Sequence, residues 1–117
     1  CSRKNAAAAA AELDAAHAGE CIALPANLST PEGVAALSTE LAEREKKIDI
    51  LINNAGANWN EALESFPPEA FQKVTFLNLH VPFLLTRALL PLLETAATVT
   101  DPARVINIGS IDGVKPP

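Results

Sequence analysis

The sequence predicts an α/β fold, in which a parallel sheet carries helices on both of its faces. Short apolar runs rich in β-branched residues alternate along the chain with longer helical patterns, the order expected of parallel strands joined by crossover helices. The two clearest runs, residues 48–53 and 104–108, are apolar on both sides, as inner strands of a parallel sheet are. Each of these runs ends in polar or small residues, which suits the ligand-binding edge of such a sheet.

The chain opens with a predicted helix over residues 5–18, because this stretch is rich in alanine, the best intrinsic helix former. Gly19 then supplies a stop. Residues 21–24 form a short apolar run that we predict to be a strand.

A second helix is expected to start at Ser29 and to run to about Glu45. Ser29 and Glu32 have the spacing of a capping box, and Pro31 suits the first helical turn. Its apolar face would carry Val34, Leu37 and Leu41.

After a loop at residues 58–66, one long helix is predicted over residues 67–95. Its core-facing stripe would contain Phe71, Val74, Asn78, Leu85, Leu89 and Leu92. Many other large apolar residues lie off this stripe, and a helix that is apolar on more than one face is usually buried on more than one side. We therefore expect a homodimer or homotetramer that forms through this helix.

Asn78 lies four residues before Pro82 in this helix. Proline has no N–H, so the carbonyl of Asn78 lacks its normal partner within the helix. A buried carbonyl needs another donor, for which water is the usual choice. The sequence predicts a kink and a bound water at Asn78, and a simple packing kink remains the alternative.

The run Asn53-Asn54-Ala55-Gly56 directly follows the predicted strand 48–53. Ligands of open α/β sheets bind just beyond the carboxyl ends of the strands, so this run predicts a ligand edge. The alternative is that the asparagines only tie neighbouring loops together, and that alternative is strongest for Asn53.

Ser110 follows the last predicted strand, 104–108, where its hydroxyl could hydrogen-bond a substrate carbonyl or an oxyanion. The alternative is a turn serine that bonds only to local backbone. The sequence contains no GxSxG motif, so a hydrolase is disfavoured.

Ser2, Arg3 and Lys4 precede the first helix, and a hydroxyl with two cations at a strand-to-helix turn suits a 2′-phosphate.

The net charge of −5 and the pI of about 4.9 argue against a nucleic-acid partner. Prolines and Arg87 interrupt the longest apolar stretch, and no secretory leader is visible, so no membrane association and a cytoplasmic location are expected. The cysteines and histidines lack metal-ligand spacing, so no metal is expected.

Together, the NNAG run after a buried strand, the long helix with Asn78, and the VINIGS run resemble the short-chain dehydrogenase/reductase family over essentially the whole chain. Within that family the chain looks closest to NADPH-dependent 3-oxoacyl-carrier-protein reductase-like members, including those tied to rhamnolipid synthesis. The resemblance implies a Rossmann-type doubly wound sheet in a three-layer αβα sandwich. Residues 1–117 would form one partial dinucleotide-binding domain. It would run from the end of strand 2 at residues 1–3, through strands 3 and 4 at residues 21–24 and 48–53, to just after strand 5 at residues 104–108.

The resemblance also implies roles for individual residues. Ser2 and Arg3 would bind the 2′-phosphate of NADP(H). Asn27 and Leu28 would lie beside the adenine ring, although Asn27 replaces the aspartate usual in the family. Asn54, Ala55 and Gly56 would line the adenosine ribose. Ser110 would hold the substrate carbonyl, and the backbone carbonyl of Asn78 would hold the water of a proton relay.

Strand 1 with its glycine-rich phosphate loop would precede Cys1, and the catalytic tyrosine and lysine would follow Ser110. The 117 residues contain no tyrosine, so this chain alone is expected to be incomplete and inactive. In full-length form it would be an NADP(H)-dependent enzyme that transfers a hydride between nicotinamide and a ketone or secondary alcohol, with a 3-oxoacyl thioester as one candidate. The alternative is a non-catalytic Rossmann-fold protein that binds a cofactor or a partner subunit.

Overall fold

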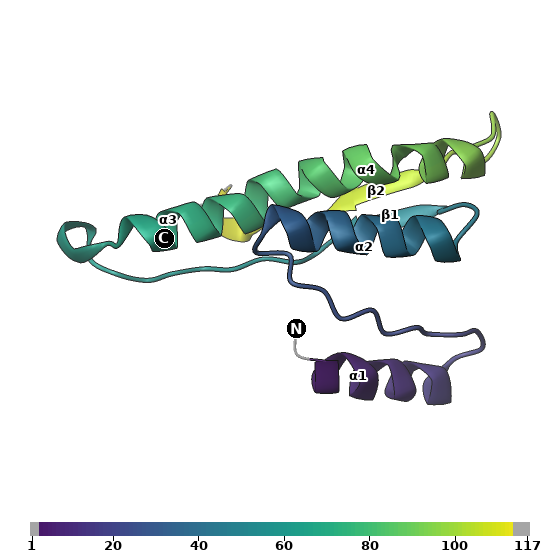
Figure 1. Cartoon of the computed structure of the whole chain (residues 1–117), viewed down its shortest axis with the longest axis horizontal. Coiled ribbons are helices and arrows are strands. Elements are labelled where there is room, and N and C mark those ends of the chain that lie inside the picture. The colour runs from purple at the N-terminus through teal and green to yellow at the C-terminus, as the bar shows by residue number, and fades with distance from the viewer. Residues whose placement is uncertain (1–2, 114–117) are drawn as a thin grey trace.

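The computed structural model of the chain describes residues 3–113, which contain helices and a two-stranded parallel sheet (Figure 1). The α-helices are α1 (Arg3–Ala16), α2 (Pro31–Arg44), α3 (Pro68–Thr75) and α4 (Val81–Ala96), and the strands are β1 (Ile50–Asn53) and β2 (Arg104–Asn107). A π-helical turn, Phe76–His80, joins α3 to α4, and short 3₁₀ turns cover Leu63–Ser65 and Ile111–Gly113. The order of helices and strands agrees with the prediction, except at Arg3 and at residues 21–24.

The two strands pair in parallel, in the register Ile50 with Arg104 through Asn53 with Asn107. α4 contacts both strands from one side of the sheet. Ile50 and Ile52 are 51% and 57% exposed. The expectation that both strands are buried on both faces is therefore wrong for the described residues, because none of their helices covers the second face.

A helix pair on the sheet forms the main core. α2 packs beside α4, and the buried residues Val34, Val81 and Leu85 meet between them (Figure 1). Leu89, one turn further along α4, is only 1% exposed. Burial of each such side chain contributes about 1.5–3 kcal/mol to folding, so this helix pair is the main source of stability.

α1 stands apart from this core. It contacts none of the other described helices and strands, and an extended segment at residues 17–30 leads from it to α2 (Figure 1). The predicted strand at residues 21–24 is wrong, since this segment has no regular structure. An isolated strand leaves its backbone groups unpaired, and no described strand lies beside this one. Arg3 is already helical, so the predicted strand end at residues 1–3 is wrong there, and Cys1 and Ser2 lie outside the described residues.

The cap of α2 is Thr30 rather than the predicted Ser29. The hydroxyl of Thr30 accepts a hydrogen bond from the backbone N–H of Gly33 at 3.1 Å, and Pro31 is the first helical residue. The predicted capping box is wrong, because with Thr30 as the cap Glu32 stands one position too early to complete it.

The helical segment after Pro67 is less regular than the single helix predicted for residues 67–95. In the π turn the N–H of Val81 bonds to the carbonyl of Phe76, five residues back. The turn lies at the place where Asn78 and Pro82 predict a kink. The buried stripe contains Ala70, Val81, Leu85, Leu89 and Leu93. Phe71 and Asn78 are exposed, contrary to the prediction, because the wider turn shifts the helical register on its N-terminal side.

By length and composition, the helical segment Pro68–Ala96 could cross a membrane, and it is the single such segment in the described part of the chain. A core helix of a soluble domain can have the same length and composition. Here the buried stripe of α4 packs against α2 and both strands, as a core helix does.

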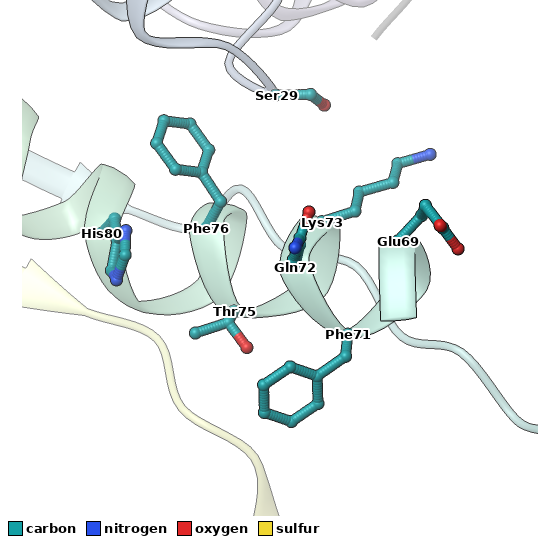
Figure 2. Close-up of a pocket in the computed structure, with 8 residues that line it drawn as sticks. All are labelled: Ser29, Glu69, Phe71, Gln72, Lys73, Thr75, Phe76 and His80. Carbon is teal, nitrogen blue, oxygen red and sulfur yellow. The ribbon is translucent and has the colours of Figure 1, made fainter. Parts of the chain in front are cut away.

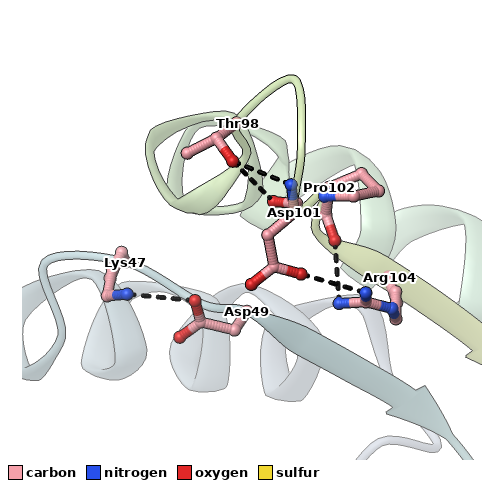
Figure 3. Close-up of polar contacts among 6 residues, drawn as sticks. All are labelled: Lys47, Asp49, Thr98, Asp101, Pro102 and Arg104. Carbon is pink, nitrogen blue, oxygen red and sulfur yellow. Dashed lines mark hydrogen bonds and ion pairs between the residues drawn. The ribbon is translucent and has the colours of Figure 1, made fainter.

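Polar side-chain contacts surround the amino ends of the two strands (Figure 3), and a backbone hydrogen bond joins them. The N–H of Arg104 bonds to the carbonyl of Asp49 at 2.9 Å, and the Arg104 side chain pairs with Asp101 at 3.0 Å. Lys47 pairs with Asp49 at 3.0 Å. A functional site is expected at the other end of the sheet, which holds the carboxyl ends of the strands.

Candidate functional site

A groove of about 590 Å³ lies at the carboxyl ends of β1 and β2. Three separate parts of the chain line it. The loop after β1 contributes Asn54, Ala55 and Gly56, the helical segment contributes Asn78, Leu79 and Pro82, and the loop after β2 contributes Ile108, Gly109 and Ser110. The predicted ligand edge and both predicted catalytic residues therefore meet in one place, as expected for a parallel sheet.

Asn78 uses its side chain to hold the loop after β1. Its Oδ1 accepts a hydrogen bond from the N–H of Ala57 at 2.8 Å, and its Nδ2 donates to the carbonyl of Ala57 at 2.8 Å. Both ends of the amide are thus engaged by one backbone unit. The side chain fixes the position of the loop, and Pro82 cannot donate a hydrogen bond to the backbone carbonyl of Asn78.

Asn53 has a structural role, which was the alternative left open from the sequence. It is 8% exposed, and its Nδ2 donates to Asn107 Oδ1 at 2.9 Å and to Thr86 Oγ1 at 3.4 Å. Its carbonyl accepts the N–H of Ile108 at 3.0 Å. This residue therefore ties the ends of both strands to α4.

Asn107 and Thr86 also belong to this network, and neither was predicted from the sequence to do so. A signal for Asn107 was present, because the paired strand sequences ILIN and RVIN both end in asparagine. In parallel strands in register, two such amides lie side by side on the same face of the sheet.

Ser110 lies in the groove, beyond the end of β2. Its carbonyl accepts a hydrogen bond from the N–H of Gly113 at 3.2 Å, which closes the turn Ile111–Gly113. The residue is exposed, and a Cβ added to its neighbour Gly109 would meet nothing within 4 Å. The groove is therefore open beside Ser110.

Comparison with known proteins identifies the family. The family model described as short chain dehydrogenase matches residues 1–117. The chain belongs to the short-chain dehydrogenase family. This result confirms the resemblance seen in the sequence, and with it the Rossmann-type α/β fold.

Members of the short-chain dehydrogenase family similar to this chain include a Rhamnolipids biosynthesis 3-oxoacyl-[acyl-carrier-protein] reductase of Pseudomonas aeruginosa. It is 47% identical over 96 residues, which make up 82% of this chain and 38% of that protein. The solved Pseudomonas aeruginosa RhlG/NADP active-site complex superimposes with a TM-score of 0.89 at 44% identity, and covers 98% of this chain and 45% of that one. A metagenomic short-chain oxidoreductase in complex with NADP gives a TM-score of 0.85 at 30% identity, over 99% of this chain and 51% of that one. The chain thus spans about half or less of the length of these relatives.

The residues expected on the adenosine side of a dinucleotide are only partly brought together in this short-chain dehydrogenase. Leu28 packs against the core between α2 and α4 and lines a cavity of about 180 Å³ together with Asn54 and Ala55. Asn27 lines neither this cavity nor the main groove, and its Oδ1 accepts the N–H of Ser29 at 3.1 Å. Ser2 and the side chain of Arg3 lie outside the described residues, so their predicted role is untested.

A separate groove of about 470 Å³ runs along α3 and the π turn, and Ser29 also lines it (Figure 2). Its wall includes Phe76 and His80, whose rings meet edge to face with 5.7 Å between their centroids. Lys73 and Phe76 extend on the side of the helix where Ser29 lies, whereas Phe71 extends on the other side (Figure 2). None of the residues predicted to act in catalysis or cofactor binding lines this groove.

Proposed function

We propose that the full-length form of this short-chain dehydrogenase is an NADP(H)-dependent oxidoreductase that transfers a hydride between nicotinamide and a ketone or secondary alcohol. The observation that carries the proposal is the groove in which the NNAG loop, Asn78 and Ser110 meet. The relatives support it, since one is named as a 3-oxoacyl-[acyl-carrier-protein] reductase and two solved neighbours are complexes with NADP.

The groove residues fit a dinucleotide. Asn54, Ala55 and Gly56 are exposed and line the groove, and Asn78 holds the next residue of their loop by two hydrogen bonds. This arrangement presents a fixed edge to the ribose of a bound cofactor. When bound, the nicotinamide would supply or accept the hydride.

Ser110 and Asn78 have separate roles in the proposed reaction. The Ser110 hydroxyl would donate a hydrogen bond to the substrate carbonyl oxygen, where negative charge develops during reduction. The backbone carbonyl of Asn78 would accept a hydrogen bond from a relay water. The chain contains no tyrosine, so the proposed proton donor would come from another part of a longer protein.

For the substrate we propose a 3-oxoacyl thioester, on the basis of the reductase named above. For the assembly we propose a homodimer or homotetramer formed through residues 67–95. Large apolar side chains on this helical segment support that proposal, since Phe71, Phe83 and Leu90 are 65%, 63% and 46% exposed.

The replacement Ser110→Ala in the full-length protein tests the proposed reaction. We expect kcat for ketone reduction to fall about 100-fold, because a hydrogen-bond donor to the developing oxyanion is lost. The dissociation constant for NADPH, measured by fluorescence titration, should stay unchanged. The matched control Ser38→Ala removes a hydroxyl from α2, outside the groove, and should leave kcat unchanged. Unaltered turnover in Ser110→Ala would refute the assigned role.

A non-catalytic cofactor-binding or partner-binding protein of the same family is the alternative. The sequence downstream of Pro117 in a longer parent distinguishes the two. A Tyr-x-x-x-Lys run there supports the enzyme, and its absence together with intact NADPH binding supports the alternative.

A further inference from the structure

The turn that enters α2, residues 27–33, is closed by contacts within itself. Asn27 Oδ1 accepts the N–H of Ser29 at 3.1 Å, and Thr30 Oγ1 accepts the N–H of Gly33 at 3.1 Å. The carbonyl of Thr30 accepts the N–H of Val34 at 3.2 Å. The start of α2 and the chain before it therefore form one small unit.

Gly33 makes this closure possible. A Cβ at Gly33 would overlap the carbonyl oxygen of Asn27 and lie 2.8 Å from its carbonyl carbon. Those atoms belong to the backbone, so they cannot rotate away as the end of a side chain can. The backbone of Gly33 is helical, so the close approach, and not conformational freedom, is the reason for glycine at this position.

The turn determines the position of Leu28. It lies directly after Asn27 and packs against the core cluster of Val34, Val81 and Leu85. It also lines the 180 Å³ cavity together with Asn54 and Ala55, and these two residues also line the main groove. A shift of Asn27 away from Gly33 would therefore move the Leu28 wall of the space beside the NNAG loop.

We propose that Gly33 is a positioning residue for the dinucleotide, which acts by setting the Leu28 wall beside Asn54 and Ala55. This inference rests on the proposed function, which places the ribose of the cofactor along Asn54, Ala55 and Gly56. A hydrogen bond with Gly113 holds Ser110, and two hydrogen bonds with Ala57 hold Asn78. None of these bonds involves the turn at residues 27–33. Gly33 therefore controls cofactor affinity and leaves the chemical step unaffected.

The test compares Gly33→Ala with the control Ala36→Gly in the full-length protein. We expect Gly33→Ala to raise the KM for NADPH about tenfold, with kcat at saturating NADPH changed less than about twofold. Ala36 is exposed in the middle of α2, so Ala36→Gly weakens the same helix without touching the turn. It should lower the Tm and leave the KM unchanged. An unchanged KM in Gly33→Ala, or an equal rise in the control, would overturn the inference.

A second pair of variants covers the case in which Gly33→Ala does not fold. Thr30→Val removes the hydroxyl that caps Gly33, whereas Thr30→Ser keeps it. The inference expects a higher KM and weaker NADPH binding by fluorescence titration in Thr30→Val, with wild-type values in Thr30→Ser. Equal values in both variants would contradict it. A wild-type protein that neither binds NADPH nor reduces ketones would overturn the proposed function as well, which distinguishes the two failures.

Discussion

Two regions of the chain, residues 30–110 and the residues before them, differ in what stabilises their structure. In the later region, α2, α4 and both strands pack together, and a polar network joins the strand ends. In the earlier region, α1 contacts no other described helix or strand, and the segment after it is extended and pairs with no described strand, although Leu28 near its end packs against the core. The alanine-rich α1 shows that local propensity is enough to specify a helix, while residues 21–24 show that it does not specify a strand.

The sharpest test of this difference compares one leucine from each region. Leu89 in α4 is 1% exposed, whereas Leu13 in α1 is 49% exposed. In the 117-residue chain, Leu89→Ala should lower the free energy of unfolding by about 2–5 kcal/mol, since it leaves a cavity in the core. Leu13→Ala should cost less than about 1 kcal/mol. Urea denaturation measures both values, and similar costs would mean that α1 is packed as well.

The second largest effect on the free energy of unfolding is expected in the polar network of the packed region. Asn53→Ala removes the donor to Asn107 and Thr86, and should lower the free energy of unfolding by about 1–3 kcal/mol. Asn60→Ala, in an exposed loop, is the control and should change it by less than about 0.5 kcal/mol. A double-mutant cycle with Asn107→Ala isolates the pair. A coupling energy of zero would contradict the direct bond.

Hydrogen exchange tests the unpaired segment without any mutation. The amides of residues 22–24 should exchange at least about tenfold faster than that of Leu89, because no described strand pairs with them. Exchange followed by NMR on the 117-residue chain measures this ratio. Equal protection would show that residues 22–24 are paired, and would remove the contrast between the two regions.

The smallest effect is expected at the exposed rim of the packed region. Asp101→Ala removes the ion pair with Arg104, whose side chains are 74% and 52% exposed respectively (Figure 3). The loss should be less than about 1 kcal/mol, because solvent screens this pair. It should shrink further in 1 M salt, which denaturation at two salt concentrations would reveal. A loss as large as that of Asn53→Ala would show that the rim is as important as the core network.

Much of the fold follows from patterns that are local in the sequence. Both parallel strands were predicted within two residues of their ends, and α2 within two residues of its start and one of its end. The irregular helix at Asn78 was also predictable, because Pro82 lacks the N–H that the helix needs there.

The features that were not predicted from the sequence depend on contact partners that the sequence alone does not identify. A strand at residues 21–24 needs a neighbour, and the capping role of Thr30 depends on where the helix starts. The bond between Asn53 and Asn107 depends on the register of two strands about 50 residues apart, and the overlap at Gly33 depends on the path of Asn27. For the same reason the sequence indicated that Asn78 and Ser110 lie at one edge of the sheet, but did not indicate the contact between Gly33 and Asn27.

The π turn at Phe76–His80 has a consequence for how this helix tolerates changes in its length. Relative to a regular α-helix, the turn holds one additional residue. Deleting a residue from most helices rotates everything beyond it by about 100°. Here a deletion could instead be absorbed by conversion of the turn into regular α-helix, so the core stripe of α4 would survive. Asn78 lies within the turn, so such a deletion would bear on its bonds to Ala57, and hence on the groove, more than on the core.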